Sequence, residues 1–146
     1  MINNVAFGAG SAGGTSLSTE ASALSISVGN WSGKRLIHDI GMTNARTTGN
    51  ITVTALYVWS SVSSRILTTV VMWGGQTVYS GSFGLPTSKP ASPNLTLQKT
   101  GIMNYSASTD TSSSFAFSTD FSTGNTFNVV YRMSDGSESG TYPYPK

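Results

Sequence analysis

The chain has 146 residues, which suits a single domain, and it combines a formal net charge of +2 with 10% charged residues and no cysteine, so disulfide bonds and thiolate metal sites are excluded. Its basic residues are scattered, whereas nucleic acids require a clustered basic surface, so we expect no nucleic-acid partner. No stretch approaches the roughly 20 apolar residues of a membrane helix, and the first residues lack the pattern of a secretion signal, so we expect neither membrane binding nor secretion.

Residues 1–22 are poor in large apolar side chains and predict an extended N-terminal arm. Within it, Gly8–Gly14 has the composition of a flexible segment, and Phe7 is its one aromatic anchor. Residues 24–28 then alternate apolar side chains with serines, which predicts a short half-buried strand.

Two longer strands are expected next. In the first of them, alternation places four side chains on one face: Leu36, His38, Ile40 and Met42. The second, Ile51–Trp59, is β-branched and aromatic almost throughout and is the strongest strand signal in the chain. The same alternation places Tyr57 and Trp59 on one face with Ile51 and Val53, so both aromatic rings are expected in the core.

The second half of the chain continues the strand pattern. Gly74–Gly75 separates two β-rich segments by the spacing of a two-residue hairpin turn, and the prolines of Pro86–Pro93 predict a loop. Phe115 and Phe117 alternate in a later strand. The last clear strand has an inward face of four residues, Phe127, Val129, Tyr131 and Met133.

Residues 137–146 end in a Tyr-Pro-Tyr-Pro sequence that suits an extended, polyproline-like tail. No window shows the apolar spacing and caps of a helix, so we expect little or no helix. The whole chain, 1–146, is therefore predicted to be one all-β domain. We expect an antiparallel β-sandwich or jelly roll of about eight strands, with extended N- and C-terminal arms.

The residues give little support for chemistry. His38 is the only histidine, and strand neighbours point to opposite faces, so His38 and Asp39 are not expected to form the pair that a nucleophilic triad needs. A zinc site needs three or four His, Cys or carboxylate ligands, and the carboxylates are interpreted as solvated loop residues. We therefore predict no catalytic residue, no metal site and no cofactor.

Two other functions remain open from the residues. Five aromatic side chains are candidates for a surface that stacks on sugar rings: Trp31, Trp59, Trp73, Tyr57 and Tyr79. For Trp59 the core is the favoured interpretation, whereas Trp31 lies in a turn and is undecided. Ser114–Met133 alternates Ser and Thr with Phe and Val across a Gly-Asn turn, as a membrane-inserting hairpin does.

The pattern of strands and turns along the sequence resembles that of a known class of proteins. Gly33–Ile40 is followed by Thr43-Asn44, a Thr/Gly turn and the Ile51–Trp59 strand, and Phe127–Tyr131 closes the pattern. Over about residues 28–133 this arrangement resembles small β-sandwich proteins of bacteriophage virions, of the capsid decoration or cement type. The Pro-rich loop and the tyrosine-proline tail depart from that pattern.

The resemblance implies a non-catalytic structural subunit of a virion, a capsid decoration protein or related head or tail protein, assembled in the host cytoplasm. Its partners would be the major capsid protein, other virion proteins and copies of itself. We expect binding through arms and edge strands, with Phe7, Tyr142 and Tyr144 as anchors of the assembly interface. The alternatives are a carbohydrate- or receptor-binding module, with a glycan partner, and a β-pore-forming protein.

Overall fold

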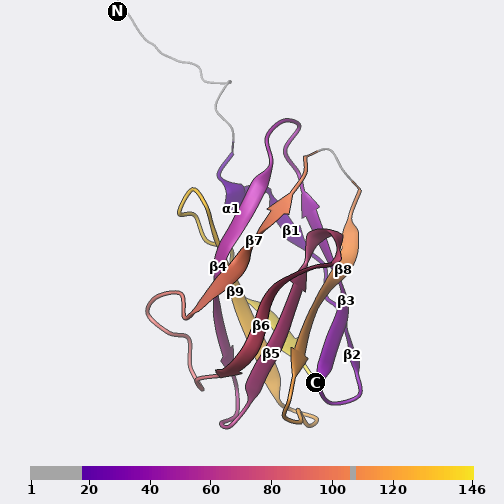
Figure 1. Cartoon of the computed structure of the whole chain (residues 1–146), viewed down its shortest axis with the longest axis vertical. Helices are drawn as coiled ribbons and strands as arrows, with labels where there is room; N and C mark the ends of the chain where they lie inside the picture. The colour runs from indigo at the N-terminus through magenta and orange to yellow at the C-terminus, as the bar shows by residue number, and fades with distance from the viewer. Residues whose placement is uncertain (1–17, 106–107) are drawn as a thin grey trace, which may run out of the picture.

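The computed structural model describes residues 18–105 and 108–146. Within these ranges ten strands form two antiparallel sheets, which confirms the predicted all-β sandwich (Figure 1). About eight strands were expected, and the two additional ones are the short strands β2 and β10. The strands are β1 (Leu24–Ile26), β2 (Asn30–Ser32), β3 (Leu36–Asn44), β4 (Ile51–Ser60), β5 (Ile66–Met72), β6 (Gln76–Gly84), β7 (Leu95–Met103), β8 (Asp110–Phe117), β9 (Thr126–Met133) and β10 (Tyr142–Pro145).

The two sheets differ in size. The larger, which we call the β3 sheet, has the order β1-β3-β8-β5-β6, and β2 also pairs with β3. The smaller, the β4 sheet, has the order β10-β9-β4-β7. Figure 1 shows β6, β5, β8 and β3 side by side in the larger sheet. Stacking brings β6 next to β7 on one side of the sandwich and β1 next to β10 on the other.

Apolar side chains from both sheets fill the space between them. The inward face predicted for the last long strand is confirmed, since four side chains of β9 are at most 1% exposed: Phe127, Val129, Tyr131 and Met133. Phe127 packs on Phe115 of the opposite sheet with ring centroids 4.9 Å apart. Burying each such side chain contributes about 1.5–3 kcal/mol, so the packing of these side chains between the sheets stabilises the sandwich.

The chain enters the sandwich through one helical turn, α1 (Glu20–Ala23). Thr19 caps this turn, because its Oγ1 accepts a hydrogen bond from the amide of Ser22 at 3.2 Å. The arm predicted for residues 1–22 therefore included residues 20–22, which belong to this helical turn. A capping side chain and a carboxylate in the first turn are sufficient to stabilise one turn of helix. A single turn does not require the repeated apolar spacing by which helices are recognised in a sequence.

Glu20 fixes this turn to the β4 sheet. It is only 8% exposed, and its Oε1 accepts hydrogen bonds from Ser134 Oγ at 2.7 Å and from the Asp135 amide at 3.1 Å. The Asp135 carboxylate accepts from the Glu20 amide at 2.9 Å in return. Glu20 is therefore a buried structural residue and not a solvated loop carboxylate.

A β-bulge in β3 changes which side chains point inward. Asp39 has a φ of 57°, and the register with β8 shifts between Ile37 and Ile40, which are both fully buried. Leu36 and His38 therefore lie on the outer face, although alternation alone predicted them on the inner one. The extra residue reverses the alternation at Asp39.

A second bulge lies in β4 between Val53 and Ala55, because these two residues oppose consecutive residues of β9. After this bulge, the side chains that point into the sandwich are those of residues 56, 58 and 60, which are all fully buried. Tyr57 and Trp59 consequently lie on the outer face and not beside Ile51. Tyr57 is nevertheless buried, at 4% exposure, as expected for a core residue, whereas Trp59 is half-buried, so its predicted place in the core is wrong. A period of two cannot reveal the inserted residue.

The hairpin between β5 and β6 is confirmed, but its connection has three residues and not the predicted two. Its connection is a short 3-10 turn, Trp73–Gly75, in which Gly74 and Gly75 both have a φ of 73°. Only glycine adopts two successive conformations of this kind without strain. The Pro86–Pro93 segment lies between β6 and β7, outside any strand, as predicted.

The Ser114–Met133 segment does not form a hairpin. β8 pairs with β3 and β5, whereas β9 pairs with β4 and β10, so the two strands belong to different sheets. Phe115 and Phe127 point into the core between them. The turn signal at Gly124 is real, since its φ is 91°, but it connects the two sheets.

The end of the chain is strand β10 and not a polyproline-like tail. It pairs antiparallel with β9, and Tyr144 lies opposite Phe127. Tyr144 is 2% exposed, and its ring packs on Phe115 and Phe127 with centroid distances of 6.0 and 6.2 Å. Prolines are tolerated because β10 is an edge strand, and burial of the tyrosine ring stabilises the pairing.

Candidate functional site

The side of the sandwich where β1 faces β10 contains an apolar groove, which we call the open side. Its volume is about 100 Å³, and almost all of its surface is hydrocarbon. Six residues line it: Ile26, Ser27, Val28, Tyr142, Pro143 and Tyr144. Val28 is 75% exposed, the highest value among the large apolar side chains that the structure describes. Val28 and the groove together form a small exposed apolar surface.

The backbone of β1 has a free edge along this groove. Ser27 donates its amide to Gly41 O at 2.9 Å, and Ala23 O accepts from the Ala45 amide at 2.9 Å. Backbone groups alternate in direction along an edge strand, so Ile26 and Val28 direct theirs away from β3. Since β1 ends the order of its sheet, no described strand pairs with them. This edge can accept an additional strand.

The facing edge of β10 is blocked by prolines. The amide of Lys146 donates a hydrogen bond to Asn125 O at 2.8 Å. Because backbone amides alternate in direction along a strand, the even-numbered residues of β10 direct their amides toward β9. The outward positions are therefore Pro143 and Pro145, and proline has no N–H. An added strand consequently finds donors and acceptors on β1, but no donor on β10.

Two buried phenols form the floor behind the groove. Tyr144 lines the groove, and the hydroxyls of Tyr144 and Tyr131 are buried without a hydrogen-bond partner among the described residues. Burial raises the pKa of Tyr144 to about 12. Burial raises the pKa of Tyr131 well above its ordinary value, and the neighbouring Tyr144 raises it further. Both phenols therefore stay neutral, so the floor carries no charge.

The opposite side of the sandwich is closed. There β6 and β7 are the edge strands, and Gln98 of β7 bridges them. Ser80 donates its amide to Gln98 Oε1 at 2.9 Å, and Gln98 Nε2 donates to Ser80 O at 2.9 Å. The side-chain amide thus satisfies the outward N–H and C=O of Ser80, one residue of β6, as a paired strand would. This side is less suited to strand addition.

The outer face of the β4 sheet carries a polar network around Tyr57. The Tyr57 hydroxyl donates a hydrogen bond to Glu138, whose Oε2 also accepts from Arg132 Nε at 2.7 Å. The hydrogen bond from Tyr57 lowers the pKa of Glu138, and Arg132 lowers it further. Lys89 Nζ lies 5.0 Å from the Tyr57 ring centroid. The network therefore fixes Tyr57 beneath charged side chains.

The aromatic residues considered for sugar stacking do not form one platform. Trp31 packs on Phe117 and Phe121 with centroid distances of 5.9 and 5.0 Å. Trp73 and Tyr79 are partly buried against the core. Only Trp59 is a half-buried side chain of the outer β4 face, where it lies opposite Asn128 in the strand register.

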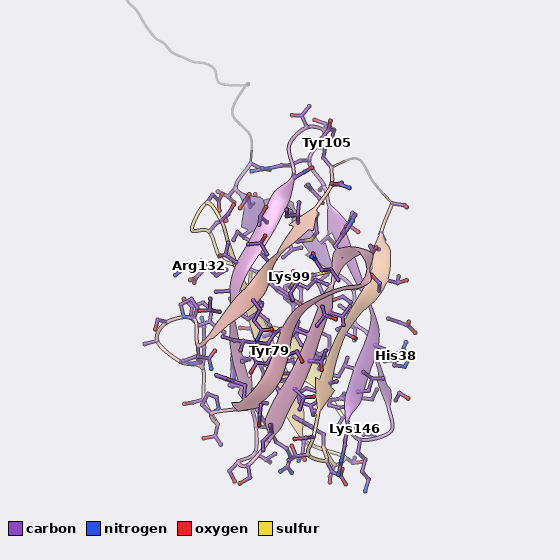
Figure 2. All side chains as sticks on the ribbon, viewed as in Figure 1. His38, Tyr79, Lys99, Tyr105, Arg132 and Lys146 are labelled. Atoms are coloured by element: carbon purple, nitrogen blue, oxygen red, sulfur yellow. The ribbon has the colours of Figure 1, made fainter. Side chains whose placement is uncertain are left out.

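His38 and Asp39 do contact each other, which the alternation of side chains had excluded. His38 Nδ1 lies 2.9 Å from Asp39 Oδ2, because the bulge at Asp39 turns both side chains to one face. Both are well exposed, at 37% and 60%. Figure 2 shows His38 and Arg132 on opposite flanks of the molecule, so the two polar clusters are separate.

Two of the three predicted interface residues meet in the groove. Tyr142 and Tyr144 both line it, whereas Phe7 lies outside the described residues. Ile26 and Val28 were not predicted as interface residues. Their signal in the sequence was the alternation of the first strand, which shows apolar side chains but not whether a neighbouring strand covers them.

Among the described residues no group of three or more His, Cys, Asp and Glu side chains is arranged to hold a metal ion. No helix in the same part of the chain has the length and apolarity to span a membrane. Comparisons of the chain with protein-family models, with curated proteins and with solved structures give no match.

Proposed function

We propose that the chain is a non-catalytic structural subunit of a virion, a capsid decoration protein or related head or tail protein, that binds its neighbours through the open side. Its partners are the major capsid protein, other virion proteins and further copies of the chain. The virion assignment is supported by the resemblance of the Gly33–Ile40 and Ile51–Trp59 strands to phage proteins. The open side supports assembly.

The supporting observation is a contrast between edges. Folded β-proteins blunt their edge strands, because an exposed edge recruits other strands. Here Pro143 and Pro145 blunt β10, and Gln98 bonds the outward backbone groups of Ser80 in β6. The edge at Ile26 and Val28 has neither protection and lies beside an apolar groove. A free backbone edge beside an apolar groove favours a binding function.

The test is the mass of the purified chain by size exclusion with light scattering over a wide concentration range, together with its binding to purified virus particles from the same source. Val28→Asp places a charge at the groove without touching the core, since Val28 is 75% exposed. Ile102→Asp is the matched control, because Ile102 is 50% exposed on β7.

We expect the wild type and Ile102→Asp to associate equally and Val28→Asp to lose at least tenfold in affinity. A wild-type chain that stays monomeric at every concentration and binds no particle contradicts the proposal. Equal losses from both substitutions contradict the open side as the binding surface.

Glycan binding is a second candidate function, and the position of Trp59 favours it. The bulge in β4 places this ring on the outer face of the sheet, half-buried beside Asn128. An indole face next to an amide is suited to stacking on a sugar ring and bonding its hydroxyls. Titration of a glycan library against tryptophan fluorescence tests it, with Trp59→Ala expected to remove any response. A response that survives this substitution contradicts the Trp59 site.

A further inference from the structure

We propose that the open side binds the N-terminal segment of a second copy of the chain, which adds to β1 as an extra strand and places Val5 and Phe7 in the groove. This inference rests on the proposed function, because it names the partner and the contact through which the subunits assemble.

The backbone of β1 defines the form of the ligand. Ile26 and Val28 direct their unpaired backbone groups away from β3, so the complementary ligand is an extended segment that pairs with them. Pro143 and Pro145 have no N–H to offer on the facing edge, so this segment pairs with β1 alone.

The groove defines the side chains of the ligand. Its walls are Ile26, Val28, Tyr142 and Tyr144, and its surface is almost entirely hydrocarbon. A strand added to β1 presents every second side chain to these walls, so it needs apolar residues two positions apart. Because the two tyrosine hydroxyls behind the groove stay neutral, no charged ligand group is favoured there.

The sequence before Ser18 contains such a segment. Val5 and Phe7 are separated by the small residue Ala6, and no charged residue occurs among residues 1–17. The structure describes the chain from Ser18, whose carbonyl accepts a hydrogen bond from Arg46.

The length of this segment is sufficient to reach a neighbouring copy. The eleven residue steps from Phe7 to Ser18 span at most about 40 Å when extended, more than the roughly 30 Å diameter of a small domain. The glycine-rich Gly8–Gly14 separates the two apolar side chains from the folded domain.

Disulfide trapping tests the contact directly, because the chain has no cysteine of its own. A chain with Phe7→Cys is mixed with a differently tagged chain carrying Val28→Cys and oxidised, and the hetero-linked dimer is measured. Ile102→Cys replaces Val28→Cys as the control, since Ile102 is exposed on a different side of the sandwich. We expect the Phe7–Val28 pair to cross-link at least tenfold faster than the Phe7–Ile102 pair.

Equal rates for the two pairs overturn the inference. So does a chain carrying both Phe7→Cys and Val28→Cys that cyclises at every concentration, because the segment then occupies its own groove. Phe7→Asp in the full chain separates this inference from the proposed function. If Phe7→Asp associates like the wild type while Val28→Asp does not, the segment is not the ligand but the open side still mediates assembly. If the wild type never associates, the proposed function itself fails.

Discussion

Tyr144 and Phe127 are direct partners in the register of β10 and β9, and their rings stack with centroids 6.2 Å apart and planes 26° apart. This contact ties the last strand to the centre of the core, since Phe127 also packs on Phe115. The C-terminal residues therefore determine both the stability of the sandwich and the shape of the groove.

Replacing Tyr144 by alanine is expected to destabilise the fold by about 3–5 kcal/mol, because it removes a buried ring and leaves a cavity. Tyr144→Phe is expected to change stability by less than about 1 kcal/mol or to increase it, since the hydroxyl has no hydrogen-bond partner among the described residues. Urea unfolding measures both. A large loss in Tyr144→Phe would show that the hydroxyl is bonded.

Stability is expected to fall at alkaline pH. Below pH 10 the tyrosines are protonated in both states, but above it the unfolded chain releases protons that folded Tyr144, with a pKa of about 12, retains. The unfolded state is thereby favoured, by about 2 kcal/mol from Tyr144 alone once the pH reaches its folded pKa. Urea unfolding from pH 9 to 12 measures the loss, and Tyr144→Phe is the control, which should show a shallower decline.

Asp39 is expected to be a strained position. Its φ of 57° suits glycine and is unfavourable for a β-branched residue. Asp39→Gly should be more stable than Asp39→Val by about 1–3 kcal/mol in thermal or urea unfolding. Both variants lose the contact with His38, so their difference isolates the backbone conformation. Equal stabilities would indicate that the bulge relaxes.

The carboxylate of Glu138 is expected to titrate below its ordinary pKa of 4.5, chiefly because Tyr57 donates a hydrogen bond to it. Tyr57→Phe should raise the pKa of Glu138 toward the ordinary value, and Arg132→Met should raise it as well. Carbon-detected NMR titration of the carboxylate measures each shift. A pKa unchanged by Tyr57→Phe would place the hydroxyl away from Glu138.

Gln98 is expected to protect the edge of β6. In Gln98→Ala the Ser80 amide loses its acceptor at 2.9 Å, and its hydrogen exchange should become roughly five- to tenfold faster. The neighbouring exposed Lys99 supplies the control, since Lys99→Ala removes no bond to Ser80. Equal protection in both variants would show that another group covers the amide.

The sequence was sufficient for the fold class because local chemistry dictates it. β9 alternates except at Val130, and its four predicted inward residues, Phe127, Val129, Tyr131 and Met133, are buried as expected. The glycines of the β5–β6 connection correctly predicted a turn, and the prolines after β6 correctly predicted a loop, because the backbone preferences of both residue types do not depend on distant contacts.

The bulges and the final strand were not predictable in this way. One inserted residue at Asp39 and another after Val53 reversed the faces of His38 and Trp59, and a periodic pattern carries no mark of such a residue. The sequence of Tyr142–Pro145 is typical of a solvated tail, and only the tertiary contacts of Tyr144 with Phe115 and Phe127 make it a strand. The groove is formed by residues 26–28 and 142–144, which are far apart in the sequence, so it could not be predicted without the folded structure.

The prolines of β10 also determine the kind of object that the open side can join. A second folded sandwich aligned with this side would have to continue both sheets, and the β4 sheet offers no N–H donor at Pro143 or Pro145. A lone extended segment needs pairing from one sheet only, and β1 supplies it. The open side therefore favours a single extended strand over an aligned sandwich that would have to continue both sheets.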